Sequence, residues 1–261
     1  SAVEYGLAAQ ELEAGDSGLR TFVSVQGSLA MGAIHKHGSE EQKAQWLPRM
    51  TTGEAVGCFG LTEPGAGSDA AALRTRAVRD GDHYVLNGQK QFISGAGSTD
   101  LLVAMVRTGG DGPGGVSTVV IDGKTPGVSF GNNERKMGRN AQPTRAVIFE
   151  NARVPVANRL GEEGIGFKIA MAGLDGGRLN IAACSLGGAQ AALDKALAYM
   201  KDRKAFGKRL DEFQALQFKI ADMATELEAA RSLLYRAAAK LDARAPDATA
   251  FCAMAKRFAT D

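Results

Sequence analysis

The sequence predicts an α+β fold in three parts: a helical segment over residues 1–50, a β-domain over 51–157 and part of a helical bundle over 158–261. Two observations predict this division. In the first and last parts, apolar residues recur at the spacing of one helix face. The middle part consists of short runs rich in Val, Ile, Thr and Phe between glycine turns, which is typical of an antiparallel barrel or sandwich.

The first part is expected to be helical, with breaks at Gly27, Gly32 and Gly38. Gly38 and Ser39 have the order of a helix-ending glycine followed by a serine that caps the next helix. The chain starts directly in helical sequence without a residue that we expect to cap it. We therefore expect sequence to be missing upstream.

In the middle part the clearest element is a hairpin with strands at 73–78 and 83–86. Asp80-Gly81 supplies the positive φ angles that its tight turn needs. The glycine-rich stretch 109–115 is expected to be an exposed hairpin loop. Further strands are expected at 89–94, 101–106, 116–121 and 145–149.

The last part predicts a helix over about 164–200 and then a long helix with an apolar stripe from Leu216 to Leu241. Asp211 and Gln214 have the spacing of a capping box at the start of that long helix. A third helix is expected near Pro246 and is still running at Asp261. We expect the chain to be truncated at this end also.

Composition excludes several classes of protein. Apolar residues make up 44% of the chain and charged residues 23%, with a net charge of +2, which is typical of a soluble globular protein and argues against a nucleic-acid surface. Cys58, Cys184 and Cys252 lack metal-ligand spacing, so we expect buried thiols, a reducing compartment and no metal site. No signal peptide or membrane span is expected, which favours the bacterial cytoplasm or the mitochondrial matrix.

The densest signal for chemistry is the run Phe59-Gly60-Leu61-Thr62-Glu63-Pro64-Gly65-Ala66-Gly67-Ser68-Asp69. Its small side chains allow the backbone to approach a flat ring or a phosphate and to donate N–H groups. The alternative is a tight turn after a strand, which is the commoner role of glycine-rich loops.

This run closely resembles the signature of the acyl-CoA dehydrogenase family, and other motifs follow in the family's order. They are Asn87 to Ser94, Lys136-Met137-Gly138, Phe149-Glu150, Val154-Pro155, Leu160-Gly161, Gly166-Phe167, Arg203 to Gly207, and Phe213-Gln214. Several motifs in register over nearly the whole chain are more specific than any one of them. The resemblance implies the family's arrangement of a helical segment, a β-domain and a helical bundle.

The resemblance also implies FAD as the cofactor. The implied cofactor-binding residues are Phe59, Gly60, Leu61, Thr62, Gly67, Ser68, Phe92, Ile93, Ser94, Arg203, Phe206, Phe213 and Gln214. Ser94 stands where relatives often have Thr and Phe92 where many have Trp, and these residues keep a hydroxyl and an aromatic face. Arg203 by resemblance meets the FAD of a neighbouring subunit, and a solvated charged face is the alternative.

For the acyl-CoA, the implied contacts are Ser68, Asp175, Gly176, Gly177 and Arg178. A helix-surface ion pair is the ordinary alternative for Arg178. The base that removes the α-proton is, in the family, usually a Glu on a late loop, which we expect beyond Asp261. One subgroup carries it at the position of Gly177, which has no proton chemistry, and Glu63 by resemblance belongs to the cofactor loop. We therefore assign no catalytic residue.

Two branches of the family are represented. Residues 1–50 resemble the glutaryl-CoA dehydrogenase branch, in which residues matching Arg20 and Ser24 hold the distal carboxylate of the substrate. Residues 51–261 are most similar to the isobutyryl-CoA dehydrogenase branch. If Arg20 faces the acyl pocket it implies a dicarboxylic substrate, because a buried unpaired cation is costly, and if it faces water it implies nothing.

The expected function is the FAD-dependent α,β-dehydrogenation of a short acyl-CoA, straight or branched, to its 2-enoyl-CoA, in fatty acid or amino acid catabolism. The alternatives are a glutaryl-CoA-type dehydrogenase and a fragment that binds FAD or acyl-CoA without turnover. A flavin-free scaffold is a further alternative. The expected partners are a second copy, in a homodimer or homotetramer, and an electron-transferring flavoprotein that accepts the electrons.

Overall fold

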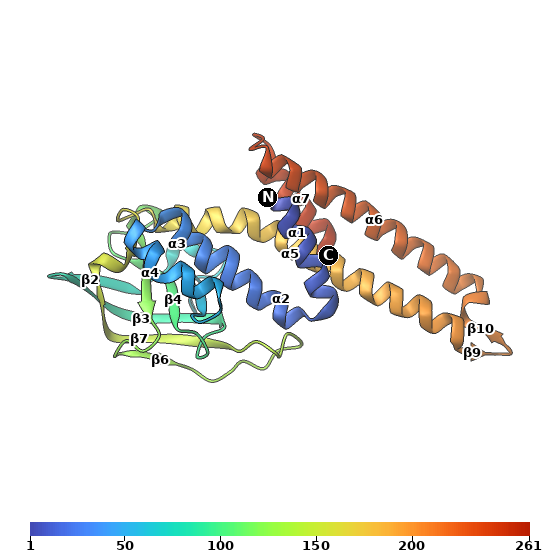
Figure 1. The fold of residues 1–261 in the computed structure, drawn as a ribbon, viewed down its shortest axis with the longest axis horizontal. Coiled ribbons are helices and arrows are strands. Elements are labelled where there is room, and N and C mark those ends of the chain that lie inside the picture. The colour runs from blue at the N-terminus through green and yellow to red at the C-terminus, as the bar shows by residue number, and fades with distance from the viewer. The chain divides into compact units, whose positions relative to one another are not determined.

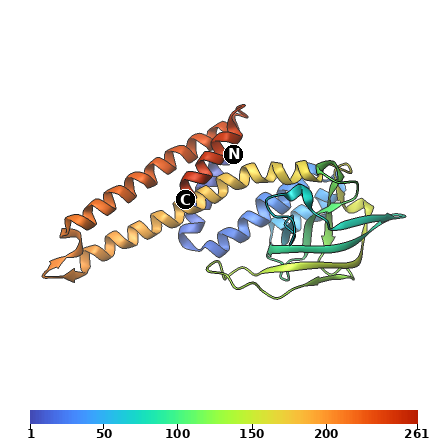
Figure 2. The same ribbon diagram turned by 180° about the vertical axis from the view of Figure 1, so that it is seen from behind.

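The computed structural model describes residues 1–261 except for the side chain of Asp175 (Figures 1 and 2). The chain divides into two compact units. The helical unit consists of Ser1–Arg20 and Asp175–Asp261, and the sheet unit of Thr21–Leu174. Helices and a mainly antiparallel sheet are both present, so the expected α+β fold class is confirmed.

Eight strands form the sheet of the sheet unit. They are β1 (Gly57–Gly60), β2 (Arg76–Asp80), β3 (His83–Ser94), β4 (Leu101–Arg107), β5 (Val116–Asp122), β6 (Val128–Phe130), β7 (Thr144–Pro155) and β8 (Arg159–Leu160). Their order is β6-β7-β3-β2-β4-β5-β8, and β1, which is outside this order, pairs with β4. The pairing of β1 with β4 is parallel, which differs from the all-antiparallel arrangement that we expected.

The expected hairpin is present as β2 and β3. Asp80 pairs with His83, so the turn residues are Gly81 and Asp82, one position later than expected, and of these two only Gly81 has a positive φ, at 63°. The strands expected at 83–86 and 89–94 are one strand, β3, with irregular pairing to β7 near Gly88 and near Phe92. The glycine-rich stretch 109–115 connects β4 to β5, as expected.

Strand β4 lies between two hydrophobic cores because alternate side chains of a strand point to opposite faces. Leu101, Val103 and Met105 pack with residues of the helices α3 (Gly32–His37) and α4 (Glu40–Thr51). Leu102, Ala104 and Val106 pack in a second core with residues of β3 and β7. Every residue of β4 is buried, and Figure 1 shows the helices on one side of the strands.

One prediction for the helical segment is confirmed and two are wrong. Ser39 caps α4 in a reciprocal capping box with Gln42, as expected. Gly27 and Gly32 do not break the helix, which continues from α2 (Ser17–Ser24) through a π-helical segment (Val25–Met31) into α3. The start of α1 (Ala2–Gly15) is capped, because Ser1 and Glu4 form a capping box.

Within the π-helical segment, the buried Gln26 side chain explains why the helix continues. Its Nε2 donates to the carbonyl oxygens of Met50 and Ala55, and its Oε1 accepts from the N–H of Gly57. These tertiary hydrogen bonds connect the helix to the start of β1. A single π-helical segment inside an α-helix is the usual form of such a local irregularity.

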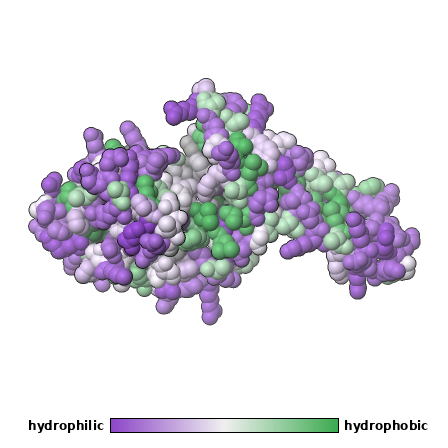
Figure 3. Space-filling view, in the orientation of Figure 1, coloured by the Kyte–Doolittle hydropathy of each residue, from purple (hydrophilic) through white to green (hydrophobic). Residues whose placement is uncertain are grey.

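In the helical unit, α1 packs with α5 (Gly166–Asp202), α6 (Gln214–Asp242) and α7 (Ala248–Thr260) around one core. Helix α1 approaches α5 closely at Gly187, where an added Cβ would lie 2.2 Å from the Gln10 carbonyl oxygen. The long helices are confirmed. Apolar residues also reach the surface over these helices, as Figure 3 shows.

The capping box expected from Asp211 is absent at the start of α6, where Phe213 is the N-cap and makes no side-chain cap bond. Asp211 instead accepts a hydrogen bond from the Nε of Arg209. A short hairpin, β9 (Lys204–Ala205) and β10 (Lys208–Arg209), joins α5 to α6 and was not predicted.

The three cysteines are buried thiols, as expected. Burial raises the pKa of the Cys58 thiol to about 11, so this group is a neutral thiol at physiological pH. No helix in the described part of the chain is both long and apolar enough to cross a bilayer.

Candidate functional site

The two segments that resemble flavin-binding motifs lie next to each other in the sheet unit. The first leaves β1 after Gly60, which pairs with Ala104 of β4. Two residues later the carbonyl oxygen of Thr62 accepts a hydrogen bond of 2.8 Å from the N–H of Gln91 in β3. Ser94 follows Gln91 three residues later on the same strand. A side-by-side arrangement of the two motifs is therefore present.

Glu63 organises the loop that follows Thr62. Its N–H and carbonyl exchange hydrogen bonds with Ala66, which closes a tight turn. Its buried carboxylate accepts from the N–H groups of Arg74 and Thr75, at 2.6 and 3.0 Å, and from Lys90 Nζ at 2.7 Å. Burial acts to raise the pKa of Glu63, but the Lys90 charge and these hydrogen bonds lower it below its ordinary value. Glu63 is thus ionised and fully engaged.

The outer side of this loop is open. Gly67 and Ser68 are exposed, and an added Cβ at Gly65 or Gly67 would meet no atom within 4 Å. Phe59, Gly60 and Leu61 instead pack inward, and an added Cβ at Gly60 would lie 3.1 Å from the Leu102 side chain, which is a tight contact. The loop therefore presents backbone and a hydroxyl, rather than bulky side chains, to anything that binds there.

Phe92 has a strained backbone and an exposed ring. Its φ is 58°, a conformation that non-glycine residues adopt only rarely. It lies where the pairing of β3 with β7 shifts between Lys90 and Ile93, and its side chain is 61% exposed. Ile93 is buried in the core between β3 and β7. The bulge therefore directs an aromatic side chain outward, an arrangement that often marks a functional site.

A pocket of about 350 Å³ adjoins Phe92 and Ser94. It is lined by Thr21, Phe92, Ser94, Glu134, Arg135, Lys136, Arg139, Gln142 and Thr144. Lys136 Nζ holds its wall together by donating to the carbonyl oxygens of Arg139 and Gln142 and to the hydroxyl of Thr144.

Sequence reasoning missed most of this lining. Lys136 belongs to the family-like motif Lys136-Met137-Gly138, but no role in a site was assigned to it from the sequence. Glu134 and Thr144 were not assigned a role either. Their proximity to Ser94 depends on the pairing of Ser94 with Thr144 in β7, fifty positions later. No local pattern in the sequence could reveal that pairing.

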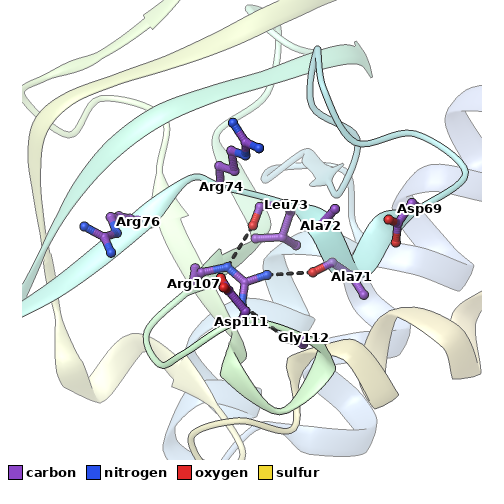
Figure 4. Close-up of a pocket in the computed structure, with 9 residues that line it drawn as sticks. All are labelled: Asp69, Ala71, Ala72, Leu73, Arg74, Arg76, Arg107, Asp111 and Gly112. Carbon is purple, nitrogen blue, oxygen red and sulfur yellow. Dashed lines mark hydrogen bonds between the residues drawn. The ribbon is translucent and has the colours of Figure 1, made fainter.

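A second depression, of about 750 Å³, lies at the far end of the same loop (Figure 4). It is lined by Asp69, Ala71, Ala72, Leu73, Arg74, Arg76, Arg107, Asp111 and Gly112. It is larger than the pocket at Ser94 but includes none of the proposed flavin-ring contacts. We therefore take the smaller pocket as the candidate site for the flavin ring.

Four further candidates for cofactor binding lie together in the helical unit. Phe206, at the turn of the β9–β10 hairpin, has a φ of 52° and is 96% exposed. Arg203 precedes the hairpin and is exposed, and its carbonyl accepts from the N–H of Leu210. Phe213 and Gln214 mark the start of α6.

The substrate candidates Gly176 and Gly177 lie inside helix α5. An added Cβ at either glycine would meet no atom within 4 Å, so packing within the chain does not require glycine there. Arg178 is half-buried, and the side chain of Asp175 lies outside the described residues. Two adjacent glycines cost helix stability, roughly 0.5–1 kcal/mol each relative to alanine.

Arg20 does not face water. It is 2% exposed, and its Nε lies 2.6 Å from the Glu13 carboxylate, which is 11% exposed. Ser24 follows four residues later on α2, the spacing of one helix face. The charge of Arg20 is thus already balanced by a carboxylate of the same chain.

Comparison with known proteins identifies the family. Residues 1–54, 58–152 and 164–261 match the N-terminal, middle and C-terminal domains of acyl-CoA dehydrogenase, respectively. The chain belongs to the acyl-CoA dehydrogenase family.

Individual members of the acyl-CoA dehydrogenase family are similar over nearly the whole chain. The mitochondrial isobutyryl-CoA dehydrogenase of Dictyostelium discoideum is 50% identical over 100% of this chain and 63% of its own length. Subunit CarC of the caffeyl-CoA reductase–Etf complex of Acetobacterium woodii is 47% identical over 92% of this chain and 63% of its own length. The chain thus spans about 63% of the length of these curated relatives.

Solved structures of the acyl-CoA dehydrogenase family share the fold. A glutaryl-CoA dehydrogenase from Mycobacterium smegmatis in complex with FADH2 superimposes with a TM-score of 0.91 at 39% identity. The match covers 99% of this chain and 67% of that structure.

Proposed function

We propose that this chain carries the FAD site of an enzyme that oxidises a short acyl-CoA, straight or branched, to its 2-enoyl-CoA. The hydrogen bond between Gln91 and Thr62 supports the proposal most directly, because it joins both flavin-like motifs into one wall. In this reaction a base takes the α-proton and FAD, when bound, accepts the β-hydrogen as hydride.

The residues in the sheet unit fit a flavin. The open loop at Gly67 and Ser68 offers backbone N–H groups and a hydroxyl to a phosphate or a ring edge. Phe92 offers an exposed aromatic face and Ser94 a hydroxyl at the adjoining pocket. These residues would bind and orient the ring, and the ring of Phe92 would exclude water from one face.

The residues that would contact FAD in this proposal are Phe59, Gly60, Leu61, Thr62, Gly67, Ser68, Phe92, Ile93 and Ser94 in the sheet unit. Arg203, Phe206, Phe213 and Gln214 would contact FAD from a neighbouring copy. The exposure of the Phe206 ring supports that assignment, because a fully exposed ring in a strained turn gains nothing within its own chain. This part of the proposal includes a homodimer or homotetramer.

The acyl-CoA would contact Ser68 and the segment from Asp175 to Arg178. The open space beside Gly176 and Gly177 supports this role. We assign no base. Glu63, a carboxylate in the loop of the proposed flavin wall, is occupied by Lys90 and two N–H groups and is thus unsuited to proton abstraction.

A glutaryl-CoA-type dehydrogenase is the second candidate. The buried Arg20 and the M. smegmatis structure favour it. The Glu13 carboxylate weighs against it, since a dicarboxylic substrate would have to compete with Glu13 for Arg20. We therefore favour a monocarboxylic acyl group such as isobutyryl or butyryl.

An electron-transferring flavoprotein is the proposed electron acceptor, and the similarity to a subunit of a complex that contains Etf supports it. We propose the bacterial cytoplasm or the mitochondrial matrix as the place of action.

Anaerobic spectroscopy tests the proposal. Purified protein should hold FAD, and butyryl-CoA or isobutyryl-CoA should bleach its visible band, whereas glutaryl-CoA should do so much more slowly. Bound flavin that never bleaches would favour a binding protein without turnover. Folded protein that takes up no FAD would contradict both.

A further inference from the structure

The loop between β1 and β2 is attached to the sheet by two buried cations. Apart from a single 3₁₀ turn, Ala70–Ala72, this loop has no helix or strand of its own. Lys90 of β3 contacts its beginning and Arg107 of β4 its end. Lys90 is 0% exposed and Arg107 8% exposed, so both charges are removed from water.

Lys90 contacts the loop on both sides of Thr62. Its Nζ lies 2.7 Å from the Glu63 carboxylate and 3.4 Å from the carbonyl oxygen of Leu61. The next residue of the strand, Gln91, donates its N–H to Thr62 itself. Three consecutive loop residues are thus bound to two consecutive residues of β3.

Glu63 extends this connection to the other end of the loop. Its carboxylate accepts from the N–H groups of Arg74 and Thr75, just before β2. One buried carboxylate therefore joins the start of the loop, its end and strand β3. The Glu63 carboxylate has three hydrogen-bond partners. If any one of them moved away, part of a buried charge would lose its hydrogen bond, which is costly.

Arg107 forms hydrogen bonds with a different part of the loop. Figure 4 shows its guanidinium pointing toward the carbonyl oxygens of Leu73 and Ala71, at 2.8 and 2.6 Å. It also donates to Gly110 and Gly112 in the neighbouring turn. Its two partners in the loop, Ala71 and Leu73, are about ten positions from Thr62 in sequence, so Arg107 provides a matched comparison for Lys90.

A buried ion pair is a costly way to attach a loop. Removing two charges from water is expensive, and apolar side chains of similar volume often stabilise a fold as well or better. A buried ion pair instead fixes one local geometry, because each charge must stay next to its partner. A pair that determines where Leu61 and Thr62 lie is thus suited to shaping a binding wall.

We propose that Lys90 and Glu63 are positioning residues that hold Leu61 and Thr62 against β3 in the shape that receives the flavin. This inference rests on the proposed function. Neither side chain touches the cofactor, since Lys90 is completely enclosed and Glu63 is turned toward Lys90 and the end of the loop. They act through the backbone of the loop.

Three variants test the inference: Lys90→Met, the double variant Glu63→Leu with Lys90→Met, and Arg107→Met as the control. FAD affinity is measured by flavin fluorescence, the shape of the visible band reports the ring environment, and urea unfolding reports stability. Lys90→Met should weaken FAD binding about tenfold, which is the scale of one or two lost hydrogen bonds. It should also broaden the visible absorption band of the flavin.

The double variant separates position from stability. It should unfold at a higher urea concentration than Lys90→Met, because no charge is left unpaired, but below the wild type, because the N–H groups of Arg74 and Thr75 lose their acceptor. It should still bind FAD about tenfold more weakly than the wild type. Arg107→Met should lower stability but keep FAD affinity within about twofold, because Arg107 bonds to the carbonyl groups of Ala71 and Leu73 and makes no hydrogen bond to Leu61, Thr62 or Glu63.

Two results would overturn the inference while leaving the proposed function intact. One is a double variant that binds FAD like the wild type. The other is equal weakening of FAD binding by Lys90→Met and Arg107→Met, which would indicate a general loss of stability. Failure of the folded wild-type protein to bind FAD would instead reject the proposed function, and the inference with it.

Discussion

Phe92 combines a strained backbone with an exposed ring. A phenylalanine at a φ of 58° is strained, and because its side chain is 61% exposed, packing of the ring adds little stability to offset the strain. Asparagine adopts this conformation more readily. We expect Phe92→Asn to raise the free energy of unfolding by about 0.5–1 kcal/mol, measured by urea denaturation, and to weaken FAD binding. An unchanged FAD affinity would show that the ring plays no part in the site.

Gly177 is a second residue that lowers local stability, here inside helix α5. Alanine there should raise the free energy of unfolding by roughly 0.5–1 kcal/mol, because it lowers the entropy of the unfolded chain and an added Cβ has free space. If acyl-CoA lies against this backbone, Gly177→Ala should also weaken acyl-CoA binding, measured by calorimetry. Gly188→Ala in the same helix is the control, since its Cβ would only reach Glu13 at 3.9 Å. Equal acyl-CoA binding by the two variants would remove Gly177 from the site.

The Glu63 carboxylate makes stability depend on pH. Its pKa is lowered in the folded protein, so the unfolded chain binds more protons between the folded and unfolded pKa values. The stabilisation is complete above the ordinary pKa of a glutamate and is lost as the pH falls through the folded value. Burial lowers the pKa of Lys90 to about 8, with Glu63 opposing and Arg107 reinforcing that shift, so Lys90 stays charged throughout this acidic range.

We therefore expect the difference in unfolding free energy between wild type and Glu63→Gln to be large at pH 7 and to shrink steadily toward pH 3. Urea denaturation at several pH values measures it. A difference that is independent of pH would mean that the charge of Glu63 does not stabilise the fold.

Among the elements, β4 matters most to the sheet unit because it contributes to two cores. Leu101 is completely buried, so Leu101→Ala should cost about 2–5 kcal/mol of unfolding free energy in urea. Leu19, which is 59% exposed, serves as the control, and Leu19→Ala should change stability by no more than about 0.5 kcal/mol. Similar effects of the two substitutions would contradict the assignment of β4 to the cores.

Elements with a local signal could be predicted from the sequence. The Asp-Gly turn predicted the β2–β3 hairpin to within one position, and the apolar stripe predicted α6. Elements fixed by distant contacts could not be predicted. The helix continues through Gly27 because the Gln26 side chain accepts a hydrogen bond from Gly57 at the start of β1, and β8 has only two residues, too few for any pattern.

The same distinction holds for the site. Thr62 and Ser94 could be named because each belongs to a contiguous motif. Lys136, Gln142 and Thr144 lie beside Ser94 only through the pairing of β3 with β7, and the role that we propose for Lys90 depends on its enclosure next to Glu63.

At the scale of the molecule, the candidate residues for the flavin ring lie in the sheet unit, and the exposed hairpin at Phe206 lies in the helical unit. Family membership rests on matches that extend over nearly the whole chain, whereas the function of the wall at Thr62 rests on geometry within the sheet unit alone.

Hydrogen exchange with and without FAD tests that wall most directly. We expect FAD to slow exchange of backbone amides in residues 59–68 and 90–94 together, with little change in β5 or β7 away from the pocket. Binding of FAD that leaves both segments unprotected would contradict the account.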